Sequence, residues 1–280
     1  MKLVTYLSGG VSRAGVLRDD GSLVDVSRAG DVLMIATDSA ARAAAGKLAA
    51  GKSKVAGRYK LRAPITPRAI ICIGLNYMDH VRETNAKVPA RPIVFAKFAN
   101  ALANPGDTVT WYNEVCAQVD YEAELGVVIG RKAYRVPESK ALAYVAGYTC
   151  INDISARDIQ KSDSGGQWVM GKTPDGFMPM GPALVTADEI KDPQTLAISC
   201  VLNGQTMQSS NTKEMIFGVA HLIAHLSKFM TLMPGDVIAT GTGPGVGAAR
   251  TPPVFMKDGD VCTIAVQGIG QLTNKMRVRM

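Results

Sequence analysis

The segment Val119–Gly130 constrains the fold more than any other part of this 280-residue chain. Its second half, Leu125–Ile129, is a continuous apolar run of the kind that forms a buried strand. If the whole run is one strand, Glu122 and Glu124 point to the same face, with Asp120 beside them. Carboxylates stacked on one face repel one another unless a cation lies between them. The pattern therefore predicts a β-rich core with an acidic site at the mouth of a buried strand.

Two interpretations of the glutamate pair follow from the residues. Glu122 and Glu124 hold a hard divalent cation such as Mg²⁺, or they face water on an edge strand. Asp153 follows the apolar stretch Tyr144–Cys150 and is a candidate third ligand, because functional side chains often lie where an element ends. Asp153 is equally suited to cap a helix. Spacing alone leaves both alternatives open.

Composition argues against several classes of function. The net charge is +7, yet the basic residues form no long block and only 6% of residues are aromatic, which disfavours nucleic-acid binding. Attraction of a small anionic substrate is a more modest use of this charge. No apolar run reaches the roughly 18 residues of a membrane helix, and the first residues do not resemble a signal peptide. We expect a cytoplasmic protein that binds neither nucleic acid nor membrane, with its five scattered cysteines reduced.

The sequence divides into two predicted units. Residues 1–60 are predicted to form a small N-terminal α+β domain, with an alanine-rich helical stretch over Asp31–Ala50. Residues 61–280 contain short strands with glycine turns, which favours a β-rich roll or barrel with peripheral helices over a parallel βαβ sheet. The predicted fold class is therefore mixed, β-rich α+β. The predicted strands include Lys2–Leu7, Gly15–Leu17, Leu23–Val26, Ala69–Ile73, Ile93–Phe95, Thr108–Trp111, Val119–Ile129, Thr195–Leu202, Asp236–Thr240, Asp260–Gln267 and Gly270–Arg277, and a helix is predicted around Pro137–Val145.

Three further features carry candidate chemistry. If Asn76–Glu83 is helical, His80 and Glu83 share a face. They are then either a general base oriented by an acid or an incidental surface pair. Lys172 lies in a loop, where it could stabilise a substrate carboxylate or a developing enolate, or simply face solvent. The glycine-rich stretch Thr240–Gly247 offers backbone N–H groups to oxyanions, or forms a plain turn.

Other motifs are absent or incomplete. His221 and His225 have the spacing of zinc-protease helices, but Leu222 replaces the required glutamate, which favours structural histidines on a packing helix. The sequence contains no G-x-S-x-G elbow, no phosphate-binding P-loop and no convincing dinucleotide fingerprint. Serine-hydrolase and P-loop functions therefore lose their main support.

Taken together, these segments resemble the fumarylacetoacetate hydrolase superfamily, in the family's order and over residues 69–278. The first 60 residues resemble the small N-terminal extension of its longer, bacterial-type members. The resemblance implies a β-roll fold with peripheral helices, a homodimer, and Mg²⁺ or Mn²⁺ on Glu122, Glu124 and Asp153. The segments that carry the resemblance are Gly74–Tyr77 with His80 and Glu83, Asp120–Leu125, Gly147–Thr149, Asn152–Asp158, Gly171-Lys172, Pro179–Pro182, Asn203-Gly204 with Gln208, Asn211-Thr212, Pro234–Ile238 and Thr240–Thr242.

The resemblance also implies roles for individual residues. His80 and Glu83 match a water-activating dyad borne on a lid, around Met78–Pro92, that orders with substrate. Lys172 matches a lysine that supports an enolate or oxyanion. The positions that match polar groups near the substrate are Arg157, Gln160 and Thr242. The sequence departs from the family pattern after Thr242, where Gly243 precedes Pro244 and makes the loop's substrate contacts less secure.

The implied activity is hydrolysis of a C–C bond in a 1,3-diketo acid of the acylpyruvate or fumarylpyruvate type. In this hypothesis the metal binds the small anionic oxo-acid substrate, His80 and Glu83 activate water, and the metal with Lys172 stabilises the enolate that leaves. The same chemistry serves isomerisation of 2-hydroxyhepta-2,4-diene-1,7-dioate or decarboxylation of oxaloacetate. A metal-binding protein that has lost catalysis is a further alternative.

Overall fold

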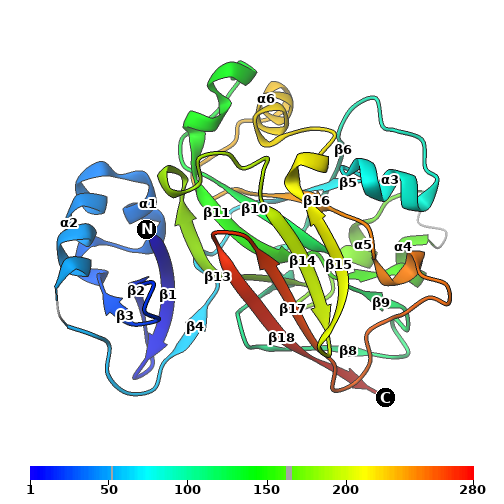
Figure 1. Ribbon diagram of the computed structural model, residues 1–280, viewed down its shortest axis with the longest axis horizontal. Coiled ribbons are helices and arrows are strands. Elements are labelled where there is room, and N and C mark those ends of the chain that lie inside the picture. Colours follow the sequence, from blue (N-terminus) through cyan, green and yellow to red (C-terminus); the bar gives the residue numbers. More distant parts are fainter. Residues whose placement is uncertain (52, 162–165) are drawn as a thin grey trace.

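A computed structural model of the chain describes residues 1–51, 53–161 and 166–280. Most of the regular structure in these residues is β-strand, and the few short helices lie around the sheets (Figure 1). This arrangement confirms the predicted β-rich α+β fold. The described residues form an eleven-stranded central sheet, a five-stranded sheet and a two-stranded pair.

The central sheet is built around strand β10 (Ala123–Ile129), all of whose residues are buried. β10 pairs antiparallel with β11 (Val145–Asn152) on one side and β16 (Val237–Thr242) on the other. The sheet order is β3-β2-β1-β13-β11-β10-β16-β5-β6, with β4 paired to β1 and β7 to β13. The remaining bounds are β1 Lys2–Ser8, β2 Val11–Leu17, β3 Leu23–Asp25, β4 Lys60–Arg62, β5 Ile70–Gly74, β6 Ile93–Lys97, β7 Leu102–Ala103 and β13 Met178–Thr186.

The prediction of one continuous strand over Val119–Ile129 is wrong near its start. The chain forms β9 (Val119–Asp120), breaks at residues 121–122, and resumes as β10. Side chains replace the strand ladder here, because the Glu122 N–H donates to Asn152 Oδ1 at 3.0 Å and the Ala123 N–H to Gln208 Oε1 at 2.9 Å. β9 pairs instead with β12 (Ser155–Ala156). Glu122 therefore lies in the break and Glu124 in the buried strand.

The five-stranded sheet packs over one face of the central sheet and encloses the main core. Its order is β15-β14-β17-β18-β8. Leu125 and Val127 of β10 lie in the same buried cluster as Ile264 and Leu272 of this sheet. Ile264 and Leu272 lie in the buried phase of strands that alternate between buried and more exposed residues. The strand bounds are β8 Thr108–Tyr112, β14 Ala197–Leu202, β15 Gln205–Asn211, β17 Val261–Val266 and β18 Gly270–Arg279.

The N-terminal segment continues the central sheet. β1 pairs antiparallel with β13, joining Lys2 to Val185 and Leu3 to Leu184. The predicted helical stretch forms α1 (Val32–Thr37) and α2 (Ser39–Ala50), which cover the sheet's outer part (Figure 1). Aspartates cap both helices, Asp31 accepting from the Met34 N–H and Asp38 from the Ala41 N–H. The division into domains at residue 60 stays a prediction.

The other helices are short and lie at the ends of strands. They are α3 (Met78–Thr84), α4 (Arg157–Lys161), α5 (Val169–Lys172) and α6 (Val219–Phe229), with 3₁₀ helices at Ser27–Ala29, Ala99–Ala101, Glu138–Tyr144, Ala187–Glu189, Thr212–Glu214 and Gly247–Ala249. The helix predicted around Pro137–Val145 is thus a 3₁₀ helix. The five cysteines are buried free thiols, as predicted. Within the described ranges, no helix has the length and apolar character needed to cross a membrane.

Candidate active site

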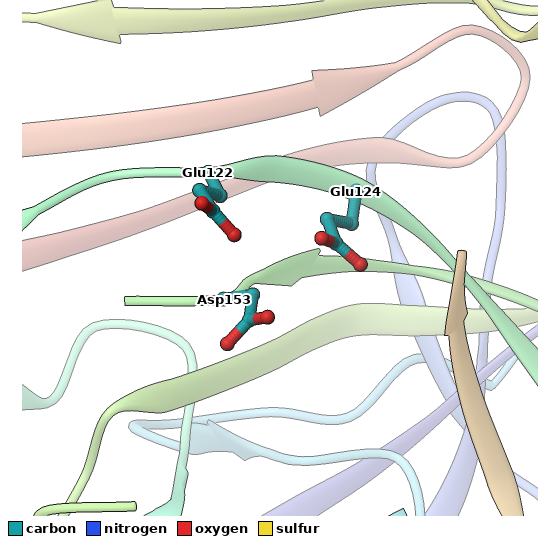
Figure 2. A group of neighbouring side chains, drawn as sticks. All are labelled: Glu122, Glu124 and Asp153. Atoms are coloured by element: carbon teal, nitrogen blue, oxygen red, sulfur yellow. The ribbon is translucent and has the colours of Figure 1, made fainter. Parts of the chain in front are cut away.

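Three buried carboxylates meet at the mouth of β10. Glu122, Glu124 and Asp153 each offer an oxygen, and these atoms lie within 4.8 Å of one another. Figure 2 shows the three neighbouring side chains, two from the chain at the start of β10 and one from the segment that follows β11. The β10–β11 register, which pairs Ala123 with Asn152, brings them together. The predicted meeting of these residues is therefore observed.

Three cations surround the carboxylates. Lys172 Nζ lies 2.6 Å from Glu122 Oε2 and 2.9 Å from Asp153 Oδ2. Arg157 Nη2 lies 2.8 Å from Glu122 Oε1. Lys97 donates to Asp153 Oδ1 and to the Ile154 carbonyl. Lys172 is therefore a buried partner of the cluster rather than an exposed loop lysine.

Lys97 was missed by the sequence reasoning, because the apolar pattern of β6 does not show which of its residues are buried. In β6, Phe95 and Lys97 are buried while Ile93, Val94 and Ala96 are exposed. A lysine in the buried phase of an alternating strand requires an acidic partner, because an unpaired buried charge is strongly destabilising. The structure supplies this partner in Asp153.

The glutamates differ in their electrostatic environment. Burial raises the pKa of Glu122, but Lys172 and Arg157 outweigh this effect and hold it at about 2. Burial raises the pKa of Glu124 well above its ordinary value, and the charges of Asp153 and Glu122 raise it further. Glu124 Oε2 accepts only the Gly241 N–H, at 2.9 Å, among its hydrogen bonds within the described residues. The protein's own cations thus leave Glu124 the least compensated carboxylate.

The donor set fits a hard divalent cation. Mg²⁺ and Mn²⁺ prefer carboxylate oxygens, and the three side chains present such oxygens close together in a buried space. A divalent cation would also supply the positive charge that Glu124 lacks. The identity of the metal stays a prediction.

A cavity of about 140 Å³ opens beside the cluster. All predicted site residues except Glu83 and Asp153 line it, and its apolar wall comes from Phe95, Trp168 and the Ile73–Leu75 segment. A cavity of this size suits a small acid, since one water occupies about 30 Å³ of the liquid. The lining residues are Ile73, Gly74, Leu75, His80, Phe95, Glu122, Glu124, Arg157, Gln160, Trp168, Lys172 and Thr242.

The predicted dyad lies on helix α3. His80 Nδ1 lies 2.8 Å from Glu83 Oε2, and Glu83 Oε1 accepts the Gly245 N–H at 2.8 Å. This geometry fixes the ring and presents Nε2 as the remaining ring nitrogen. The helical pairing is as predicted, whereas the catalytic role of the dyad stays a prediction.

The residues expected near the substrate also make internal contacts. Arg157 donates from Nε to Asp120 at 2.8 Å and from Nη1 to Gln160 Oε1 at 2.9 Å. Thr242 Oγ donates to the Ala123 carbonyl at 3.0 Å. Asp120, expected beside the glutamates, instead points to Arg157.

The histidines of α6 lie in a row of stacked rings. His221 stacks between Phe217 and His225, with ring centroids 5.2 Å and 6.2 Å apart, and Phe229 follows. His221 Nδ1 lies 3.0 Å from Glu138 Oε2. They do not line the cavity, which agrees with the structural role predicted for them.

Comparison with known proteins gives consistent relatives. A family model described as "Fumarylacetoacetate (FAA) hydrolase C-terminal" matches residues 69–277. The chain is 51% identical over 215 residues to "Oxaloacetate tautomerase fahd2, mitochondrial" of Xenopus laevis, covering 76% of this chain and 67% of that protein. It is 49% identical over 215 residues to "Oxaloacetate tautomerase FAHD2A, mitochondrial" of Bos taurus, covering 76% and 68%.

Solved structures with different activities share the fold. A fumarylacetoacetate hydrolase from Exiguobacterium antarcticum has a TM-score of 0.87 at 34% identity, with both chains fully covered. A 2-hydroxyhepta-2,4-diene-1,7-dioate isomerase from Mycobacterium marinum has a TM-score of 0.75 at 31% identity, covering 100% of this chain and 99% of that one. A maleylpyruvate hydrolase from Sphingobium sp. SYK-6, in complex with manganese(II) and pyruvate, has a TM-score of 0.83 at 27% identity, both chains again fully covered.

The fold, the carboxylate cluster and the match over residues 69–277 lead to one conclusion. This chain belongs to the fumarylacetoacetate hydrolase family.

Proposed function

We propose that this protein is a metal-dependent enzyme that interconverts the keto and enol forms of oxaloacetate or a closely related 2-oxo dicarboxylic acid. One observation carries the proposal: His80 lines the same small cavity as Glu122, Glu124 and Lys172. A base, a carboxylate metal site and a cation thus face one space. The names of relatives 49–51% identical to this chain support oxaloacetate as the substrate.

Mg²⁺ or Mn²⁺ is the proposed cofactor, held by Glu122, Glu124 and Asp153. When bound, such an ion supplies Lewis-acid polarisation of the oxygens of a 2-oxo acid. Manganese and pyruvate in the maleylpyruvate hydrolase structure support both the metal class and the substrate class.

The protein's own side chains account for the proton transfer. Glu83 holds Nδ1 of the His80 ring, so Nε2 is the ring nitrogen that accepts a proton from substrate C3. The electrons of that C–H bond form the C2–C3 double bond, and negative charge develops on the C2 oxygen. The Lys172 ammonium lines the cavity and stabilises this charge. His80 then returns the proton to the oxygen, which gives the enol without gain or loss of atoms.

Hydrolysis of an acylpyruvate or fumarylpyruvate is the second candidate, and the dyad itself favours it. A histidine oriented by a glutamate can take a proton from water as readily as from carbon. Two of the similar structures carry hydrolase names. Isomerisation of the heptadienedioate type and decarboxylation of oxaloacetate use the same enolate and are outcomes of the same test.

A turnover screen tests the proposal. Purified protein is given oxaloacetate, acylpyruvates and 2-hydroxyhepta-2,4-diene-1,7-dioate, with Mg²⁺, with Mn²⁺ and with a chelator. With metal present, we expect the protein to accelerate the decay of the oxaloacetate enol absorbance. The chelator should abolish this acceleration, and added metal should restore it. His80→Ala should lower the rate about 10²- to 10⁴-fold, while His221→Ala, outside the cavity, should not.

Two results would overturn it. Oxaloacetate equilibrating at the buffer rate while an acylpyruvate is cleaved would replace tautomerisation by hydrolysis. Full turnover in chelator would remove the metal. The homodimer and the cytoplasmic location stay predictions. Light scattering tests the homodimer. The names of the two vertebrate relatives include "mitochondrial".

A further inference from the structure

Asp120 is a fully buried carboxylate that the proposed proton transfer does not use. Its Oδ1 accepts the N–H groups of Tyr121 at 2.9 Å and Gly247 at 2.7 Å. Its Oδ2 accepts Arg157 Nε at 2.8 Å and the Ala248 N–H at 3.0 Å. Both oxygens therefore bind protein donors, and two of these donors are backbone N–H groups of one loop.

One set of these contacts leads to the carboxylate cluster. The β9–β12 pairing places Asp120 opposite Ser155, two residues before Arg157. With Nε held by Asp120, the guanidinium directs Nη2 to Glu122 and Nη1 to Gln160. A buried arginine needs such a partner, because an uncompensated buried charge is costly. Asp120 thus sets the direction of Arg157.

The other set leads to the dyad through the loop 243–249. Asp120 binds this loop at Gly247 and Ala248, and the loop binds Glu83 through the Gly245 N–H. The loop has little room to adjust. A Cβ on Gly245 would lie 2.0 Å from the Met207 carbonyl oxygen, and its φ is +96°.

We propose that Asp120 is a positioning residue that fixes both halves of the site. It aligns Arg157 with Glu122 and Gln160, and through the loop 243–249 it holds Glu83, which orients His80. The catalytic consequence rests on the proposed function, but the positioning of His80 is a property of the free protein.

The test is Asp120→Asn, observed by imidazole ¹⁵N NMR of the metal-free protein. The chain has three histidines, so His80 is read beside His221 and His225, which serve as internal references. In this variant an NH₂ group replaces one carboxylate oxygen and faces N–H donors, so the loop should shift. The Glu83–His80 hydrogen bond should then weaken. The His80 Nδ1 chemical shift should therefore differ from the wild-type value, which is that of a ring hydrogen-bonded to a carboxylate. The other two histidine spectra should not change.

Asp236→Asn is the matched control. Asp236 is also a buried aspartate that accepts a backbone N–H, from Met233 at 2.7 Å, but it lies outside the cavity. The His80 signals of this variant should match those of the wild type. Under the proposed activity, Asp120→Asn should also lower kcat about 10²-fold, as expected for misplaced catalytic groups, and Asp236→Asn should not.

Ala248→Pro removes the N–H that reaches Asp120 Oδ2 while leaving the Asp120 carboxylate in place, so it provides a second test if Asp120→Asn does not fold. A His80 Nδ1 shift in this variant supports the proposal. Wild-type His80 signals in a folded Asp120→Asn or Ala248→Pro protein overturn it. The NMR readout needs no substrate, so failure of the oxaloacetate assay would refute the proposed function alone.

Discussion

At the scale of single residues, Glu122 and Glu124 show that two identical side chains can have opposite ionisation preferences when their surroundings differ. Lys172 and Arg157 flank Glu122, whereas Glu124 has a backbone N–H and two neighbouring acids. The ionised form is therefore favoured at Glu122 and disfavoured at Glu124. A cation from solution would therefore stabilise the ionised form of Glu124 more than that of Glu122.

Replacement of Glu124 by glutamine should separate stability from metal binding. Glutamine is close in shape and removes the disfavoured buried charge, so the metal-free variant should be more stable than the metal-free wild type. Its Mg²⁺ affinity should fall by about 100-fold or more, since weakening even outer partners of a metal commonly costs 10- to 100-fold. Urea unfolding and isothermal titration calorimetry measure the two effects. Lower stability of the metal-free variant would contradict the environment assigned to Glu124.

The pH dependence of Mg²⁺ binding follows from the same residue. The folded-state pKa of Glu124 is raised above the ordinary value of 4.5, so the folded protein favours the protonated side chain. The contribution of Glu124 to folding stability is therefore fully present below pH 4.5. It is lost as the pH rises through the folded-state pKa. Mg²⁺ needs the ionised carboxylate, so its affinity should increase with pH over that window and binding should release a proton. Calorimetry in two buffers of different ionisation enthalpy counts the proton. An affinity independent of pH, equal to that of Glu124→Gln, would refute the assignment.

Residue patterns identified the candidate site residues better than the cations that pair with them. Five candidate residues were identifiable because each stands in a local motif. They are Glu122, Glu124, Asp153, His80 and Glu83. Their cations come from distant segments: Lys97 meets Asp153 across 56 positions. No local pattern fixes such a pairing, which depends on how β6 and β11 are arranged in the central sheet.

At the scale of elements, helix α3 reaches the site through side-chain links at both of its ends. Asp79 Oδ2 accepts Ser210 Oγ of β15 at 2.5 Å, and Glu83 accepts the Gly245 N–H. The dyad therefore depends on how firmly α3 stays against β15 and the glycine loop.

Ser210→Ala should loosen α3 without disturbing the carboxylate cluster. Loss of a hydrogen bond to a charged acceptor removes about 1.5–3 kcal/mol, so amides of Met78–Thr84 should exchange with deuterium about 10-fold faster or more. Mg²⁺ affinity should stay unchanged. Ser209→Ala, at the exposed neighbouring position of β15, is the control. Unchanged exchange in α3 would show that Asp79 and Ser210 do not hold it.

The elements were predictable where apolar alternation is strong and not where side chains replace the backbone ladder. The alternation of β17 and β18 and the apolar run of β10 identify those strands from the sequence. The break at residues 121–122 depends on Asn152 and Gln208, which accept the N–H groups a strand neighbour would otherwise bind. Neither partner is near in sequence.

At the scale of the whole molecule, the central sheet joins the N-terminal segment to the catalytic part. β1 covers the edge of β13, and Ile35 of α1 shares one buried cluster with Ile70, Val128 and Val237. Composition suggested a separate unit, because residues 1–60 contain their own turns and helices. The shared cluster instead favours cooperative unfolding, since neither part can lose its partner without exposing apolar surface.

Ile35→Ala tests this cooperativity. Ile35 is fully buried, so the truncation should lower the free energy of unfolding by about 2–5 kcal/mol. Because the cluster spans both segments, one urea transition should shift as a whole, whether followed by far-UV circular dichroism or by fluorescence of Trp111 and Trp168, which lie outside residues 1–60. Met34→Ala on the same helix, where Met34 is 52% exposed, should shift the midpoint far less. The contrary result is a tryptophan transition that stays in place while circular dichroism reveals an earlier one. In that case residues 1–60 unfold independently, and the predicted boundary separates two domains.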